Sequence, residues 1–180
     1  IVHPNGPDGI AALYGVLYGG FRATMINLAA GHDAINYALS HSEARFAFVH
    51  HSAEELYTSA VPSGITLISE ISAQEIALHQ IAPNDHALLM YTSGTTGKPK
   101  GALGSHRNLL TNGLSSAYSG AATALRRGDA LPEPSIRASL LVIPMFHVTA
   151  CSASMMPTIQ AGHKIVLLHK WDTVKAFEII

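Results

Sequence analysis

Short apolar runs alternate with amphipathic segments along the whole chain, and this alternation predicts strands and helices in turn. The apolar runs are unbroken rather than half polar, which is typical of strands whose two faces are both covered by helices. Strands are predicted over residues 22–28, 45–50, 64–68, 87–91, 139–143 and 165–168. We therefore predict an α/β fold with a mainly parallel sheet flanked by helices.

Local turn and capping signals set the predicted helix boundaries. The turn at residues 6–9 opens a helix over residues 10–18, and two glycines at 19–20 end it. Further helices are predicted over residues 33–40, 53–59, 73–79, 105–125 and 149–161, and a last one after Asp172. Pro157 falls inside one of these segments, so a kink or break is expected there. Residues 126–134 have the composition of a loop.

The composition is apolar and weakly charged. The 180 residues suffice for one domain with its own core, and 48% of them are hydrophobic. Only 13% are charged, about half the usual share. Either the fold buries most of its helices, or apolar surface meets a partner, which could be a second copy of the chain. The net charge of -1 gives no indication of a nucleic-acid or anionic-membrane partner.

The chain lacks the usual marks of export or membrane insertion. Cys151 is the only cysteine, so no disulfide can form within the chain. No apolar run is as long as a membrane span, and no secretory signal is present. We therefore expect a cytoplasmic protein. The chain starts without methionine and stops inside a helical pattern, so we also expect a fragment of a longer protein.

The segment with the most distinctive chemistry lies at residues 91–101 (YTSGTTGKPKG) and follows an apolar strand. Its three glycines allow successive backbone N–H groups to point into one concavity, and four Ser and Thr hydroxyls add donors. Lys98 and Lys100 contribute positive charge. Such a loop suits a polyphosphate. It is neither the common P-loop, because Pro99 follows Lys98, nor a dinucleotide fingerprint, because the glycine spacing differs.

This loop resembles the signature loop of the adenylate-forming (AMP-binding) superfamily, which includes acyl-CoA synthetases, luciferases and peptide-synthetase adenylation domains. Residues 105–109 (SHRNL) and 144–149 (PMFHVT) are similar to its next segments, and residues 10–56 resemble the N-terminal part of acyl-CoA synthetases. Family members join a carboxylate to AMP with release of pyrophosphate, and then pass the acyl group to a thiol, usually that of coenzyme A. The resemblance therefore implies ATP, Mg²⁺ and CoA as ligands.

The resemblance also implies roles for individual residues. The β- and γ-phosphates of ATP would be held by Thr92, Ser93, Gly94, Thr95, Thr96, Gly97, Lys98, Pro99, Lys100 and Gly101, and Thr92 would help to position Mg²⁺. His147 would lie near the acyl group and the adenylate as a catalytic residue. From the residues alone, a His between a strand and a helix is equally a capping or core-edge residue.

Other reactive residue types are interpreted as structural. Cys151 lies in a Ser- and Ala-rich helix and is read as a small buried residue rather than a nucleophile. Met155 and Met156 could line an acyl channel but are read as core, and His106 as structural. The remaining histidines lack metal-ligand spacing with Cys, Asp or Glu.

The second motif separates branches of the family. Domains that activate amino acids generally place an aspartate directly after the Phe of this motif, whereas here His147 follows Phe146. A substrate ammonium would be left unpaired, which is costly. We therefore expect a simple carboxylic acid such as a fatty or aryl acid.

Residues 1–180 are thus interpreted as part of the large N-terminal domain of an acyl-CoA synthetase, with the phosphate loop at 91–101 and the second motif at 144–149. The later motifs and the small C-terminal domain expected of the family are absent, so this chain alone is expected to be inactive. Three alternatives remain: a non-catalytic nucleotide-binding domain, an oligomerising fragment, and another adenylate-forming enzyme such as an aryl-CoA ligase or a luciferase-like protein.

Overall fold

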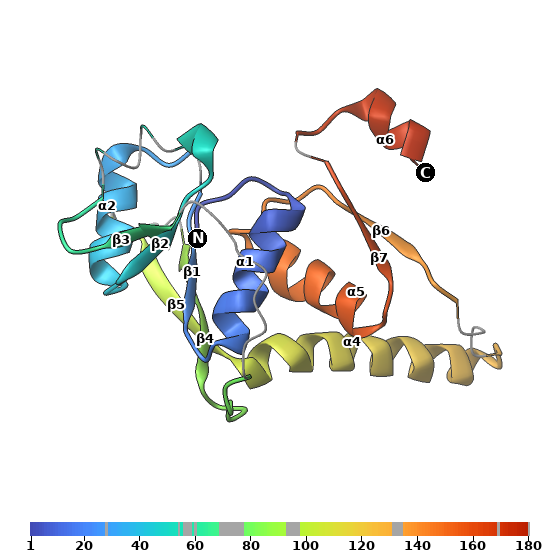
Figure 1. Ribbon diagram of the computed structural model, residues 1–180. Coiled ribbons are helices and arrows are strands. Elements are labelled where there is room, and N and C mark those ends of the chain that lie inside the picture. Colours follow the sequence, from blue (N-terminus) through green and yellow to red (C-terminus); the bar gives the residue numbers. More distant parts are fainter. Residues whose placement is uncertain are drawn as a thin grey trace.

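A computed structural model describes residues 1–27, 29–53, 55, 59, 61–68, 78–92, 98–130, 135–168 and 170–179 (Figure 1). The helices are α1 (Pro7–Tyr18), α2 (His32–His41), α4 (His106–Arg127), α5 (Met156–Gln160) and α6 (Thr173–Ile179), with a 3-10 turn at His51–Ala53 and a π-helical segment at Thr149–Met155. The strands are β1 (Ala23–Met25), β2 (Phe46–Phe48), β3 (Thr66–Ile68), β4 (His86–Thr92), β5 (Lys100–Ser105), β6 (Ala138–Leu141) and β7 (Lys164–Leu167). The α/β prediction is confirmed.

Most strand pairs in the described part of the chain are parallel. Strand β1 pairs with β4, β2 with β3, and β6 with β7, each in parallel. The exception is the antiparallel pair of β4 and β5. The mainly parallel arrangement was predicted, but the strands form three small sheets rather than one.

The first two residues join two of these sheets. The amino group of Ile1 donates to the carbonyl oxygen of Thr24 at 2.7 Å, and the carbonyl oxygen of Ile1 accepts from Ile26 N–H at 3.0 Å. On the other side of this two-residue segment, Val2 forms a parallel bridge with Val49, which directly follows β2. Residues 1–2 therefore run as a short strand that gives the order β3, β2, residues 1–2, β1, β4, β5.

Two apolar clusters fill the interior. The first lies between α1, strands β1 and β4, the start of α4 and the segment 145–156, and Leu13 and Met145 are almost fully buried in it. The second lies between α2 and β2 around Ile35 and Val2. Fully burying a side chain of this size stabilises the fold by about 1.5–3 kcal/mol. The interpretation of Met155 and Met156 as core residues is confirmed, because both are buried in the first cluster.

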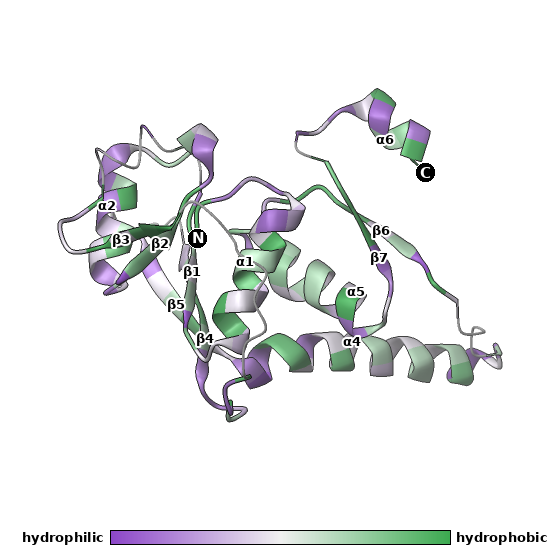
Figure 2. Ribbon diagram, viewed as in Figure 1, coloured by the Kyte–Doolittle hydropathy of each residue, from purple (hydrophilic) through white to green (hydrophobic). Residues whose placement is uncertain are grey.

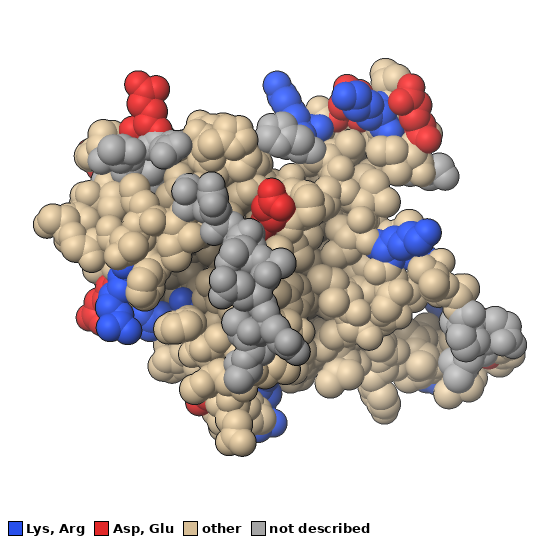
Figure 3. All heavy atoms as spheres, viewed as in Figure 1, with Lys and Arg blue, Asp and Glu red and all other residues tan. Residues whose placement is uncertain are grey.

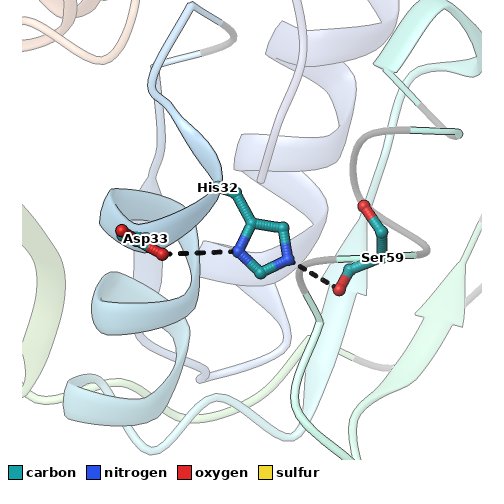
Figure 4. A network of polar contacts seen from close by, with 3 residues as sticks. All are labelled: His32, Asp33 and Ser59. Atoms are coloured by element: carbon teal, nitrogen blue, oxygen red, sulfur yellow. Dashed lines mark hydrogen bonds and ion pairs between the residues drawn. The ribbon is translucent and has the colours of Figure 1, made fainter.

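Helix α2 is tied at its start to a distant backbone group. His32 Nε2 lies 2.8 Å from the carbonyl oxygen of Ser59, so this nitrogen carries the proton and donates it (Figure 4). His32 Nδ1 faces the carboxylate of Asp33 at 3.6 Å. Because Asp33 is fully exposed, water screens the interaction between these two side chains.

Helix α4 starts with a side-chain cap and ends at a glycine, within two residues of the predicted bounds 105–125. Ser105 Oγ accepts from Asn108 N–H at 3.2 Å, and Asn108 Oδ1 accepts from Ser105 N–H at 2.9 Å, which forms a capping box. The helix ends at Gly128, whose φ of 78° is left-handed and suits glycine. The last helix is also capped as predicted, since Asp172 Oδ1 accepts from Lys175 N–H.

Much of the helical surface is apolar. Figure 2 shows hydrophobic residues along α4, and Figure 1 shows β6, β7 and α6 reaching away from the other strands. The exposed apolar side chains of α4 are Leu110, Leu114, Tyr118 and Leu125. Charged side chains form isolated spots on the face drawn in Figure 3. The low proportion of charged residues in the chain is therefore associated with exposed apolar surface. No helix in the described part combines the length and apolar character needed to cross a membrane.

The segment 149–161 departs from the prediction of one helix kinked at Pro157. It begins as a π-helical stretch, Thr149–Met155, in which the N–H of Met156 donates to the carbonyl oxygen of Cys151, and α5 follows. Pro157 lies in the first turn of α5, directly after the π-helical stretch. The irregularity therefore precedes the proline. Most residues of the helices predicted at 53–59 and 73–79 lie outside the described residues. The end of the loop predicted at 126–134 lies wholly outside them.

Candidate active site

The phosphate-loop segment lies at the tip of a β-hairpin. Tyr91 pairs with Gly101 and Thr92 with Lys100, so residues 93–99 connect two antiparallel strands. The prediction that a helix is the next element after the loop is wrong, because β5 lies between the loop and α4. The sequence of β5 contains two glycines and has a low strand propensity. The segment forms a strand nevertheless, because it pairs with β4. Residues Ser93, Gly94, Thr95, Thr96 and Gly97 lie outside the described residues.

The space above Gly101 is occupied by the side chain of Leu89. A Cβ atom at this position would lie 2.9 Å from Leu89 Cδ1, so a larger residue would require that side chain to shift. Glycine at this position therefore makes room for packing rather than providing a special backbone angle. This role in packing is separate from the flexibility that the loop chemistry suggests.

An open cavity of about 890 Å³ lies beside the hairpin. Both flanks of the loop reach it, through Thr92 and Pro99, and so does the second motif, through Phe146, His147 and Val148. Its floor and walls are mostly apolar, and include Met25, Leu88, Met90, Ala102, Gly104 and Leu109. The fold therefore brings together two motifs that are about 50 residues apart in sequence.

The two lysines of the loop do not line this cavity themselves, but each lies next to a residue that does, Lys98 and Lys100 on either side of Pro99. Leu88, Met90 and Thr92 share one face of β4, and their cross-strand partners share the same face of β5. Lys100 is the partner of Thr92, so its side chain leaves the strand on the cavity face, at the exposed end. Lys98 is held differently, because its Nζ lies 5.8 Å from the ring centre of Tyr37.

Tyr91 anchors the first leg of the hairpin to α2. Its hydroxyl donates to the carbonyl oxygen of Ala38 at 3.2 Å and lies 2.9 Å from His41 Nδ1. Partial burial, followed by the neighbouring Tyr37, raises the pKa of Tyr91 above its usual value. The hydroxyl is therefore neutral at physiological pH and serves as a hydrogen-bonding group. The sequence indicates no partner for Tyr91, and its one signal is the i, i+4 spacing of Tyr37 and His41, which places these two rings on one face of the helix.

The structure shows one of the two roles that the sequence context of His147 left open, that of a capping residue. Its Nδ1 accepts from the backbone N–H of Thr149 at 3.2 Å, and so caps the helical segment that follows. Because Nδ1 accepts, the neutral ring carries its proton on Nε2. The exposed side chain also lines the cavity. The geometry thus leaves Nε2–H available as a donor while Nδ1 fixes the orientation of the ring.

Asn5 supports the second motif from the opposite end of the chain. Its Nδ2 donates to the carbonyl oxygen of Ile143 at 2.9 Å, and its Oδ1 accepts from Met145 N–H at 3.0 Å. These two bonds hold the backbone two residues before His147. Sequence reasoning missed Asn5, since a single Asn in a turn carries no sign of a partner 140 residues away.

The interpretation of Cys151 as a buried residue is confirmed. Cys151 is buried, and burial raises the pKa of its thiol to about 12, so it is not a nucleophile at neutral pH. Within the described ranges, no group of three or more His, Cys, Asp or Glu side chains has a geometry that could hold a metal ion.

Comparison with known proteins identifies the class. Residues 1–180 match the family described as AMP-binding enzyme, and the chain belongs to that family. It is 26% identical to 4-coumarate–CoA ligase 1 of Solanum tuberosum over 196 aligned residues, covering 100% of this chain and 35% of the relative. It is 30% identical to sulfoacetate–CoA ligase of Cupriavidus necator, covering 91% and 33%. The chain thus spans about a third of the length of these relatives.

Solved structures agree with the family. The o-succinylbenzoate CoA synthetase of Bacillus subtilis, in complex with its acyl-adenylate intermediate, is similar with a TM-score of 0.77 and 26% identity, covering 98% of this chain and 44% of that one. The same synthetase in complex with ATP and magnesium ion has a TM-score of 0.76 and 25% identity, covering 98% and 45%. The resemblance to the adenylate-forming superfamily is therefore confirmed.

Proposed function

We propose that this chain supplies the phosphate loop and part of the acid pocket of an ATP-dependent carboxylate–CoA ligase, as part of its large N-terminal domain. The observation that carries the proposal is that Thr92 and Pro99, at the two ends of the loop, line the same cavity as His147. In an acyl adenylate, the phosphate of AMP is bonded directly to the acyl group. One cavity bordered by both motifs suits such a molecule.

In the proposed reaction, a carboxylate oxygen attacks the α-phosphorus of ATP and the bond to the β-phosphate breaks, so that pyrophosphate leaves. The thiol of CoA then attacks the acyl carbon, and AMP leaves. Negative charge on the phosphate oxygens increases in the first step, and N–H, hydroxyl and ammonium groups stabilise it. Lys100, on the cavity face of β5, is the residue assigned to this role, and Lys98 is the second ammonium of the loop.

The magnesium ion would be bound through the nucleotide. Mg²⁺ prefers oxygen ligands and keeps several waters, and it is commonly held by substrate phosphates with few protein groups. The described residues offer the Thr92 hydroxyl, which makes only a long 3.4 Å contact with the carbonyl oxygen of Lys100 and is free to turn. The donor set fits an ion that arrives with ATP. Its contribution would be to neutralise phosphate charge.

The cavity favours an uncharged acyl chain. None of the described residues that line it is acidic, and Met25, Met90 and Phe146 contribute apolar surface. The ammonium of an amino acid would find no partner there, which is unfavourable in a partly buried site. A fatty or aryl carboxylic acid fits, and 4-coumarate, in the name of one relative, is an aryl acid.

Calorimetric titration of the 180-residue chain with Mg-ATP tests the proposal. The Lys100→Ala variant is compared with Lys175→Ala, which removes an exposed lysine from α6. We expect weak binding that Lys100→Ala reduces further and Lys175→Ala leaves unchanged. Equal affinity in all three proteins would contradict the role of Lys100. The absence of binding in the unaltered chain would contradict the proposal that this chain holds the phosphates.

A further inference from the structure

Both legs of the phosphate-loop hairpin are attached to the same turn of α2. The Tyr37 hydroxyl donates to the carbonyl oxygen of Pro99 at 3.1 Å, on the leg that enters β5. The next residue of the helix, Ala38, accepts the hydroxyl of Tyr91 on the leg that leaves β4. One helix therefore holds the two ends of the loop at a set separation.

Three rings form the contact between the helix and the hairpin. Tyr37 stacks with His41 at a centroid distance of 5.2 Å and meets Tyr91 edge to face at 6.0 Å. His41 and Tyr91 also meet edge to face, at 5.7 Å. Because each ring contacts the other two, the position of the Tyr37 hydroxyl is fixed by packing as well as by its own hydrogen bond.

Lys98 completes the arrangement from the loop side. Its ammonium lies over the face of Tyr37, 5.8 Å from the ring centre, which is a cation–π geometry. Tyr37 thus touches two residues of the loop at once: its hydroxyl binds the backbone of Pro99, and its ring holds the charge of Lys98. A cation–π contact at an exposed site is weak, and a phosphate oxygen attracts an ammonium more strongly.

We propose that Tyr37 is a positioning residue for nucleotide phosphates, which sets the base of the loop through Pro99 and keeps Lys98 beside the site until phosphate replaces the ring. This inference rests on the proposed function, since it assumes that the loop receives phosphates. Tyr37 is a positioning rather than a catalytic residue, because it acts through Pro99 and Lys98. Tyr37 should therefore affect the affinity only for ligands that contact the loop.

The Tyr37→Phe variant isolates the hydroxyl, because it keeps the ring, its aromatic contacts and the cation–π geometry. The matched control is Tyr118→Phe on the second half of α4, where the side chain is 76% exposed. Each 180-residue protein is titrated with Mg-ATP and, separately, with AMP, which lacks the β- and γ-phosphates. We expect Tyr37→Phe to weaken Mg-ATP binding about five-fold, the size of one hydrogen bond, and to leave AMP binding and the control unchanged.

A merely structural role would lower the affinities for Mg-ATP and AMP together, and that result would overturn the inference. Unchanged Mg-ATP affinity in Tyr37→Phe would overturn it as well. If the unaltered chain binds no Mg-ATP, the proposed function fails, and amide hydrogen exchange then tests the positioning separately. Faster exchange over residues 92–100 in Tyr37→Phe, but not in Tyr118→Phe, would support the anchoring of the loop. Equal exchange would contradict it.

Discussion

Asn5 and Met145 are 140 residues apart, yet the Asn5 side-chain oxygen accepts the backbone N–H of Met145 at 3.0 Å. The amide nitrogen of the same side chain donates to Ile143. The start of the chain therefore fixes the strand end that leads into His147. This contact connects the turn before α1 to the second motif, and its loss would leave two partly buried backbone groups without partners.

The Asn5→Ala variant is accordingly expected to lose about 1–3 kcal/mol of unfolding free energy, because unsatisfied buried polar groups carry a desolvation cost. Urea denaturation measures the change. The control is Gln80→Ala, which removes an exposed amide side chain. A loss in Asn5→Ala no larger than that of the control would show that the bonds to Ile143 and Met145 contribute little.

Truncation of two adjacent leucines of α4 should lower the stability of the chain to very different extents. Leu109 is 6% exposed and lies in the first core cluster, whereas Leu110 is 46% exposed. We expect Leu109→Ala to destabilise the chain by about 2–5 kcal/mol through lost burial and a cavity. Leu110→Ala should stay within about 0.5 kcal/mol. Equal losses in urea denaturation would mean that the exposed face of α4 is covered in solution.

Two glycines of β5 offer a similar comparison beside the loop. A Cβ atom at Gly101 would meet Leu89 at 2.9 Å, whereas at Gly104 the nearest atom, the carbonyl oxygen of Leu88, is 3.9 Å away. Gly101→Ala is expected to lose about 1–3 kcal/mol because Leu89 must shift. Gly104→Ala should be tolerated. Thermal unfolding of both variants checks this, and a larger loss in Gly104→Ala would contradict the packing of the hairpin.

The burial of Cys151 should make the stability of the chain depend on pH. Burial raises the pKa of its thiol from 9.0 to about 12, so the folded protein keeps its proton over a range where the unfolded chain loses it. The stability associated with the protonated thiol is complete below pH 9 and decreases as the pH rises toward 12. In urea denaturation, the Cys151→Ala variant should lose less stability between pH 8 and pH 10 than the unaltered chain.

Alkylation gives an independent check of the same burial. Iodoacetamide reacts with the thiolate, so Cys151 should be modified slowly in the folded chain at pH 8 and rapidly in urea. Equal rates in the two conditions would show that the thiol is accessible.

The sequence was sufficient for features with a local physical cause. The bounds predicted for α4, 105–125, are within two residues of those observed, and the glycines, hydroxyls and lysines of residues 91–101 indicate a phosphate loop without reference to tertiary structure. The apolar runs likewise predicted the other strands, although β3 is exposed rather than covered on both faces.

Features that depend on distant partners were not predictable. Strand β5 has weak strand propensity and exists because β4 supplies its hydrogen bonds. The π-helical start of the 149–161 segment is not marked by its sequence. Asn5 and Tyr37 are ordinary turn and helix residues until the fold places Met145 and Pro99 beside them. A single sequence contains no signal for such pairs.

The central claim is that the phosphate loop and the second motif border one ligand site. Nuclear magnetic resonance of the ¹⁵N-labelled 180-residue chain, titrated with Mg-ATP, tests it most directly because weak binding is still visible as shifts of backbone amides. We predict that the amides of Thr92, Lys100 and His147 shift together with one midpoint. Shifts at the loop that leave His147 unchanged, or shifts at neither motif, would contradict a shared site.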